Sequence, residues 1–155
     1  MYFISHRGNT SGPNFKDENE PSYILNTIDM GFDVEIDLWF WYNCSISSGM
    51  FFLGHDKPQY PISDEFIEKI KPYAWFHCKN LEALNRIAQF DNSNYFWHQN
   101  DDFTLTSKGY IWTFPGNNVS SRSILLTKNI NDFRLKNCAG VCSDYISLIR
   151  DNIYI

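Results

Sequence analysis

Short hydrophobic runs recur along the chain, and turn residues or amphipathic stretches separate most of them. Runs of this kind are typical of buried β-strands in α/β proteins. The pattern predicts eight strands, at residues 2–5, 32–40, 50–55, 74–78, 95–99, 110–114, 123–127 and 139–144.

Helical patterns lie between several of these strands. The first contains Pro21 at its start and Gly31 at its end, which is the arrangement that a short helix favours. Ser63 and Asn80 are N-cap candidates for two further helices. The patterns cover residues 20–31, 63–71, 80–90 and the tail at 146–155.

Strands that alternate with helices indicate a parallel sheet with crossover helices. Eight such strands would fit a TIM barrel, but (β/α)8 barrels typically contain about 250 residues. The chain has 155 residues, and they show no repeat or linker. We therefore expect a single domain over residues 1–155, a compact TIM (β/α)8 barrel with several helices shortened or replaced by loops. Residues 100–109 and 115–122 are candidates for such reduced connections.

The overall charge disfavours a nucleic-acid partner, because the net charge is −5 and the isoelectric point is near 5.2. No apolar run approaches the roughly 20 residues that a membrane span requires, and the first ten residues do not resemble a signal peptide. The cysteines show no CxxC spacing, which favours reduced thiols in a cytoplasmic protein over a disulfide framework or a zinc site. They are Cys44, Cys78, Cys138 and Cys142.

Polar side chains gather at the ends of the first four predicted strands. The carboxyl ends of parallel strands meet at one edge of a sheet, where active sites of α/β proteins form. Glu35 and Asp37 are two residues apart, so both project from the same face of their strand. The other members are His6, Arg7, His55, Asp56, His77 and Lys79.

These residue types indicate phosphoester chemistry. Paired carboxylates bind hard divalent cations such as Mg²⁺ or Ca²⁺. Two histidines, His6 and His55, are candidates for a general acid and a general base near neutral pH. Arg7 and Lys79 supply positive charge for an anionic substrate. A metal ion, two histidines and two cations together suggest cleavage of a phosphodiester.

The arrangement resembles the glycerophosphodiester phosphodiesterase family, which shares a TIM-barrel fold with phosphatidylinositol-specific phospholipases C. The similarity is carried by "SHRG" (5–8), "DENEP" (17–21), "VEID" (34–37), "LGHD" (53–56), "HCK" (77–79), "YIWTF" (110–114) and "AGVCSDYI" (139–146). The resemblance implies metal-dependent hydrolysis of a small glycerophosphodiester-like molecule. It assigns acid–base roles to His6 and His55, and phosphate contacts to Arg7 and Lys79.

The resemblance also assigns metal binding to Glu35 and Asp37. The third ligand of the family is a glutamate, and this chain has His77 in its place. Imidazole still coordinates metals, but it shifts the preference toward transition metals. The expected cofactor is therefore one divalent ion, Mg²⁺ or Ca²⁺, with Mn²⁺ or Zn²⁺ as alternatives because of His77.

Several alternatives stay open at this stage. His77 either binds the metal or packs beside a carboxylate, and Trp112 either stacks on substrate or packs in the core. His98 is a weaker site candidate, while Asp56 and Asp144 are expected to hydrogen-bond near the site. The alternative function is a phosphate-ligand-binding barrel that has lost turnover, and a third is another metal-dependent lyase or hydrolase on this barrel. The expected partner is a small phosphodiester, and exposed aromatic residues leave a homodimer open.

Overall fold

The computed structural model describes residues 1–43 and 48–153. Within these residues the fold is α/β, with one mixed sheet of ten strands and four α-helices. The α/β class predicted from the alternating pattern is therefore confirmed. No helix in this part of the chain combines the length and apolar character required to cross a bilayer.

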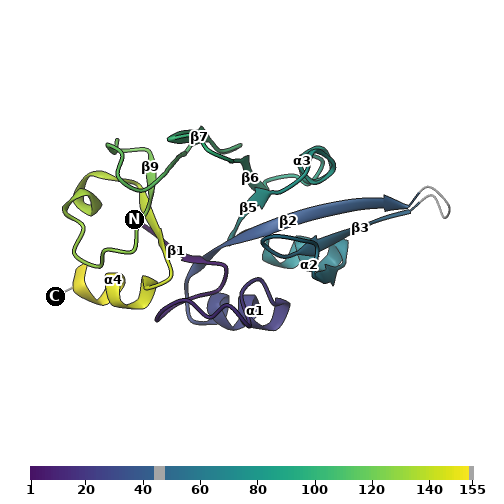
Figure 1. Ribbon diagram of the computed structural model, residues 1–155, viewed down its shortest axis with the longest axis horizontal. Coiled ribbons are helices and arrows are strands. Elements are labelled where there is room, and N and C mark those ends of the chain that lie inside the picture. Colours follow the sequence, from purple (N-terminus) through teal and green to yellow (C-terminus); the bar gives the residue numbers. More distant parts are fainter. Residues whose placement is uncertain (44–47, 154–155) are drawn as a thin grey trace.

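Seven strands of the sheet run parallel to one another. In spatial order they are β6 (Asn94–Trp97), β5 (Ala74–Cys78), β2 (Asp33–Asn43), β1 (Tyr2–His6), β10 (Gly140–Ser143), β9 (Ser123–Leu126) and β8 (Ile111–Thr113). The row curves round, so that β7 (Phe103–Leu105) at one end approaches β6 at the other (Figure 1). The amide of Ser107 donates to the carbonyl of Tyr95 at 2.8 Å and links the two ends.

Three strand pairs are antiparallel. β3 (Ser48–Leu53) pairs with β2, β4 (Tyr60–Ile62) pairs with β3, and β7 pairs with β8. The expectation that the hydrophobic run at residues 50–55 forms a parallel strand is therefore wrong. The reason is the short connection between β2 and β3, because a parallel return needs a crossover of a dozen or more residues.

The predicted helices form close to their expected positions. They are α1 (Pro21–Asp29), α2 (Asp64–Ile70), α3 (Leu81–Ile87) and α4 (Ile146–Ile153). Ser63 and Asn80 cap α2 and α3 as predicted, each by accepting a hydrogen bond from a backbone amide in the first turn. Glu20 caps α1 in the same way. A 3-10 helix at Phe133–Asn137 was not predicted.

The core has layers on both faces of the curved sheet. On β2, Val34, Ile36 and Leu38 point outward and pack with residues of α2 and α3 in the largest cluster. A second cluster fills the inner face near the start of the strands, with Ile4, Trp75, Phe96, Trp112, Ile124 and Cys142. Because side chains alternate along a strand, Glu35 and Asp37 face inward on β2. The carboxylates therefore lie inside the curve of the sheet.

The cysteines agree with the expected reduced state where the structure describes them. Cys78 and Cys142 are buried free thiols, and Cys138 is a half-buried one. Burial raises the pKa of Cys78 to about 12, so the thiol stays protonated at neutral pH. Cys44 lies outside the described residues.

Candidate functional site

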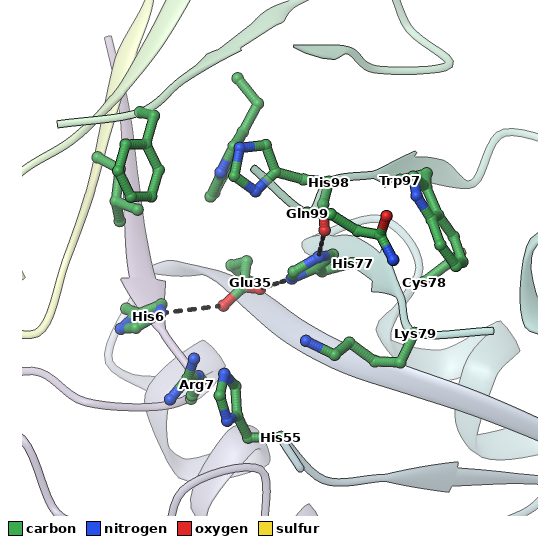
Figure 2. A pocket seen from close by; sticks show the side chains of 13 residues that line it. His6, Arg7, Glu35, His55, His77, Cys78, Lys79, Trp97, His98 and Gln99 are labelled. Carbon is green, nitrogen blue, oxygen red and sulfur yellow. Dashed lines mark hydrogen bonds and ion pairs between the residues drawn. The ribbon is translucent and has the colours of Figure 1, made fainter. Parts of the chain in front are cut away.

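A cavity of about 310 Å³ opens inside the curve of the sheet. Its polar wall contains most of the predicted site residues, from β1, β2, β5 and the segment after β3 (Figure 2). These are His6, Arg7, Glu35, His55, His77 and Lys79. Asp37 is fully buried, and it contacts the cavity residues Arg7, His77 and Lys79. The structure thus brings together in one place the residues that the strand-end pattern selected.

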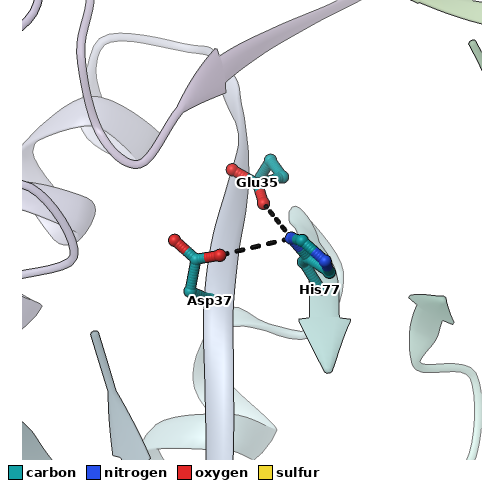
Figure 3. Close-up of side chains that lie close together, drawn as sticks. All are labelled: Glu35, Asp37 and His77. Atoms are coloured by element: carbon teal, nitrogen blue, oxygen red, sulfur yellow. Dashed lines mark ion pairs between the residues drawn. The ribbon is translucent and has the colours of Figure 1, made fainter. Parts of the chain in front are cut away.

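Glu35 and Asp37 share the inner face of β2, and strand register places His77 beside them. The Nδ1 atom of His77 lies 3.4 Å from Oε1 of Glu35 and 3.2 Å from Oδ1 of Asp37. Figure 3 shows the His77 ring directed toward both carboxylates. The exposed fraction of Glu35 is 2% and that of Asp37 is 0%. One ligand atom from each of the three residues lies within 4.8 Å of the others. This spacing is suited to donors that share one cation.

Asp37 is surrounded by positive charge. Nε of Arg7 lies 3.0 Å from its Oδ2 atom, and Nζ of Lys79 lies 3.3 Å from Oδ1. Burial by itself would raise the pKa of Asp37, but the nearby ring of His77 and the charges of Arg7 and Lys79 hold it well below its usual range. Asp37 is therefore a carboxylate at any pH near neutral.

The ring of His77 is held on two sides. Its Nε2 atom donates to the carbonyl oxygen of His98 at 2.9 Å, since a carbonyl can only accept. The ring stacks on Phe96 with a centroid distance of 5.1 Å and an interplanar angle of 8°. Burial would lower the pKa of His77, but Asp37 and Glu35 raise it to about 9. The strong interaction with both carboxylates makes His77 part of this cluster.

Asn19 holds Asp37 from the loop between β1 and α1. Its amide nitrogen donates to Oδ2 of Asp37 at 2.9 Å, and its amide oxygen accepts from the backbone nitrogen of Asp37 at 2.9 Å. The backbone of Asn19 has a φ of 62°, in the left-handed region where asparagine is tolerated better than most residues. Asn19 belongs to the segment "DENEP" (17–21), which the family resemblance marked without giving it a role, and the structure shows that it holds Asp37.

Glu18 has a related position in the same loop. Its Oε2 atom accepts from Nη1 of Arg7 at 3.1 Å, and its Oε1 atom accepts from the side-chain amide of Asn9 at 2.9 Å. Asn9 was missed in the sequence, because a single buried asparagine in a turn has no distinguishing pattern. Together these contacts fix the guanidinium of Arg7 between Glu18 and Asp37.

His6 is oriented by Asp144, which follows β10. The Nδ1 atom of His6 and Oδ1 of Asp144 are 2.8 Å apart, and Asn9 also donates to Oδ1 at 2.9 Å. On the other side of the ring, Nε2 lies 3.9 Å from Oε2 of Glu35. Burial would lower the pKa of His6, but the bond to Asp144 and the charge of Glu35 raise it. The expected hydrogen-bonding role of Asp144 is confirmed.

His55 reaches the cavity from the segment that follows the antiparallel strand β3. The amide of Gly54 donates to the carbonyl of Asp37 at 3.1 Å, which holds the turn against β2. The imidazole has an exposed side-chain fraction of 44% and bonds through Nδ1 to Asp56 at 2.6 Å. His55 lies beside Arg7 in Figure 2. Each candidate acid–base histidine thus has its own carboxylate partner.

The wall opposite the carboxylates is aromatic. Trp112 is buried and stacks on Phe96 at 4.5 Å, so it packs in the core while lining the cavity. Phe114 stacks on the ring of His98 at 5.6 Å, and it is 45% exposed. The sequence did not predict Trp97 and Phe114 as cavity residues, because nothing distinguishes them there from other residues of hydrophobic strands. This wall gives the cavity an apolar side for the organic part of a ligand.

Two carboxylate oxygens in the site lack a hydrogen bond. Oε2 of Glu35 and Oδ1 of Asp37 are buried and have no hydrogen-bond partner among the described residues. Buried carboxylate oxygens are costly unless a donor or a cation satisfies them. The donor set and these two atoms therefore fit a bound metal ion.

Comparison of the chain with models of protein families, with curated proteins and with solved structures found no match in any of the three.

Proposed function

We propose that the protein is a metal-dependent phosphodiester hydrolase that acts on a small glycerophosphodiester-like substrate. The observation that carries this proposal is a pair of histidines in the same cavity as the buried carboxylate cluster. His6 and His55 line one cavity, and each is bonded to a carboxylate of its own. Arg7 and Lys79 line the same cavity.

The proposal includes a reduced (β/α)8 barrel as the fold. In such a barrel, the seven parallel strands and the antiparallel β7 would be the eight strands of the barrel wall. The hydrogen bond from Ser107 to Tyr95 supports closure between β7 and β6. The hairpin of β2 and β3 is then an extension beyond the carboxyl end of the barrel strand β2. In this fold, active sites form where the strands end at their carboxyl side.

Glu35, Asp37 and His77 are the residues that would hold the metal ion. A bound divalent cation would polarise the phosphoryl oxygens of the substrate and offset their charge. Asn19 and Arg7 hold the Oδ2 atom of Asp37, so Oδ1 is the oxygen that faces His77. The acid–base and phosphate-binding roles belong to other residues of the cavity.

Arg7 and Lys79 bind and neutralise the phosphate. The carboxylates of Glu18 and Asp37 fix the guanidinium, which leaves its remaining N–H groups as donors in a set orientation. Positive charge that is already in place stabilises the negative charge that develops on the phosphoryl oxygens in the transition state.

His6 and His55 move the two protons. One histidine removes a proton from the attacking oxygen, and the other donates a proton to the leaving alkoxide, so that one P–O bond forms as another breaks. The attacking oxygen belongs either to water or to a neighbouring hydroxyl of the substrate, in which case the first product is a cyclic phosphate. The carboxylates of Asp144 and Asp56 bond to the Nδ1 atoms of His6 and His55 and orient the two rings, and Asp144 also stabilises the protonated form of His6.

The test is hydrolysis of a glycerophosphodiester and of an aryl phosphodiester, followed by phosphorus NMR, with each of several divalent ions. We expect His6→Ala and His55→Ala to lower the rate about 10²- to 10⁴-fold. Arg86→Ala, a surface change on α3, serves as the control with wild-type activity. Equal rates for wild type and His6→Ala would end the assignment of His6.

A second candidate function is phosphate-ligand binding without turnover. His77 favours it, because a neutral imidazole at this position leaves the three-residue donor set with less negative charge than three carboxylates would. Calorimetry with the same glycerophosphodiester separates the two functions. Binding without product under every ion tested would favour the second function.

A further inference from the structure

The structure assigns the metal position to a borderline transition-metal ion of the Zn²⁺ class, bound through Nδ1 of His77, in preference to Mg²⁺ or Ca²⁺. This inference rests on the proposed metal role of the cluster and names the ion type that the cluster selects. It also resolves the two alternatives for His77 in favour of a ligand.

The first argument comes from the hydrogen bond on the far side of the ring. Because the carbonyl of His98 can only accept, Nε2 of His77 carries a hydrogen atom. In the neutral ring, Nδ1 then presents a lone pair to carboxylate oxygens at 3.2 and 3.4 Å. Three electron-rich atoms at this distance repel one another unless a proton on Nδ1 or a metal ion lies among them, and the metal ion would take the place of that proton. A metal-binding histidine commonly donates its other N–H to a carbonyl in this way.

The second argument is the spacing of the donor atoms. Tetrahedral Zn²⁺ sites have bonds of about 2.0 to 2.1 Å, which places neighbouring donors about 3.3 Å apart. The contacts of Nδ1 with the two carboxylates, at 3.4 and 3.2 Å, bracket that value. The protein supplies three ligands, Glu35, Asp37 and His77. Three protein ligands with one open position is the pattern of catalytic zinc sites.

The third argument is the chemical type of the donors. Mg²⁺ and Ca²⁺ take oxygen ligands and depend on negative charge, whereas imidazole nitrogen suits Zn²⁺ and its neighbours. The cluster has two carboxylates, and both Arg7 and Lys79 lie against Asp37 at 3.0 and 3.3 Å. These cations weaken the field of the carboxylates for any divalent ion. The nitrogen donor of His77 is therefore the feature that selects between the two classes of ion.

The experiment uses the full chain, stripped of metal with a chelator and titrated with Zn²⁺ and with Mg²⁺ by calorimetry. We expect wild type to bind Zn²⁺ more tightly. His77→Glu should weaken Zn²⁺ binding by at least about 10-fold, the lower limit seen when a metal site loses a supporting partner, and should strengthen Mg²⁺ binding. Arg86→Ala, on α3 and outside the cavity, is the control and should bind Zn²⁺ as wild type does.

A spectrum of the wild type needs no variant that could fail to fold. In protein labelled with ¹⁵N-histidine, Zn²⁺ should shift the Nδ1 resonance of His77 while Nε2 stays protonated. If His77 is instead a permanent imidazolium, Nδ1 keeps its proton when Zn²⁺ is added, and the inference is overturned. Preference for Mg²⁺ over Zn²⁺ in wild type also overturns it. Hydrolysis supported by Mg²⁺ in the same preparation would still uphold the proposed function, which separates the two failures.

Discussion

Replacement of Asn19 tests whether the loop between β1 and α1 holds the buried carboxylate of Asp37. Asn19→Gly removes the side chain and retains a backbone that accepts the φ of 62°. Two hydrogen bonds are lost, one to the charged Oδ2 atom of Asp37 and one from its backbone amide. Asn19 is 1% exposed, so water replaces these bonds poorly.

The expected cost follows from the two bonds. A hydrogen bond to a charged group contributes about 1.5–3 kcal/mol, and a neutral bond contributes about 1 kcal/mol. We therefore expect Asn19→Gly to lower the free energy of unfolding by about 3 kcal/mol. Asn19→Ala should cost about 1 kcal/mol more, because alanine resists the left-handed backbone.

Urea denaturation followed by tryptophan fluorescence measures this difference. The matched control is Asn92→Gly, because Asn92 also has a left-handed backbone, with φ of 63°, but it lies exposed at a turn. A surface change of this kind should stay within about 0.5 kcal/mol of wild type. If Asn19→Gly and Asn92→Gly have the same stability, Asn19 does not hold Asp37 and the reasoning fails.

Three further predictions concern the histidine, the turn and the aromatic wall. Asp144→Asn should lower the pKa of His6, because burial lowers that pKa and the bond to Asp144 is the largest of the interactions that together raise it, and an NMR titration of the His6 ring that shows no fall would contradict this. The interaction of His6 with Asp144 stabilises the fold fully below pH 6.5, the ordinary pKa of histidine, and this contribution is lost as the pH rises through the pKa of His6 in the folded protein. The loss of stability caused by Asp144→Asn should therefore be smaller at high pH. Gly54→Ala should destabilise the protein by more than about 1 kcal/mol and reduce activity, since a Cβ there would meet the carbonyl oxygen of Lys57 and φ is 149°, with thermal unfolding and hydrolysis as the readouts. Trp112→Ala should lower the free energy of unfolding by about 3–5 kcal/mol, because the side chain is buried with Phe96 in the inner core cluster. Trp112→Phe should keep most of the activity if packing is the main role of Trp112. A large rise in KM for Trp112→Phe would show a substrate contact instead.

Local patterns predicted much of the fold. The caps Ser63 and Asn80 began helices where expected, and hydrophobic runs located the seven parallel strands within a few residues. The direction of β3 was missed, because a hydrophobic run has the same appearance in a parallel and an antiparallel strand. The short strands β4 and β7 were missed because Pro61 interrupts the first and the polar residues 100–102 directly precede the second, so neither stands out as a hydrophobic run.

The sequence predicted which residues form the candidate site, but it did not predict the contacts between them. The strand-end pattern selected His6, Glu35, Asp37 and His77, and the structure places them together. The contacts of Asn19 with Asp37 were not predicted, since they join a loop to a strand 18 positions further along the chain.

The sequence by itself determined which face of β2 carries the carboxylates, because side chains alternate along any strand. It also determined which residue types were available for acid–base and metal chemistry. Tertiary structure decided the partners: His6 meets Asp144, 138 positions away, because β1 and β10 are neighbours in the sheet. It also brought His55 to the cavity from an antiparallel strand. Such contacts depend on the order and direction of strands, which are set by packing of the whole chain and not by any local pattern.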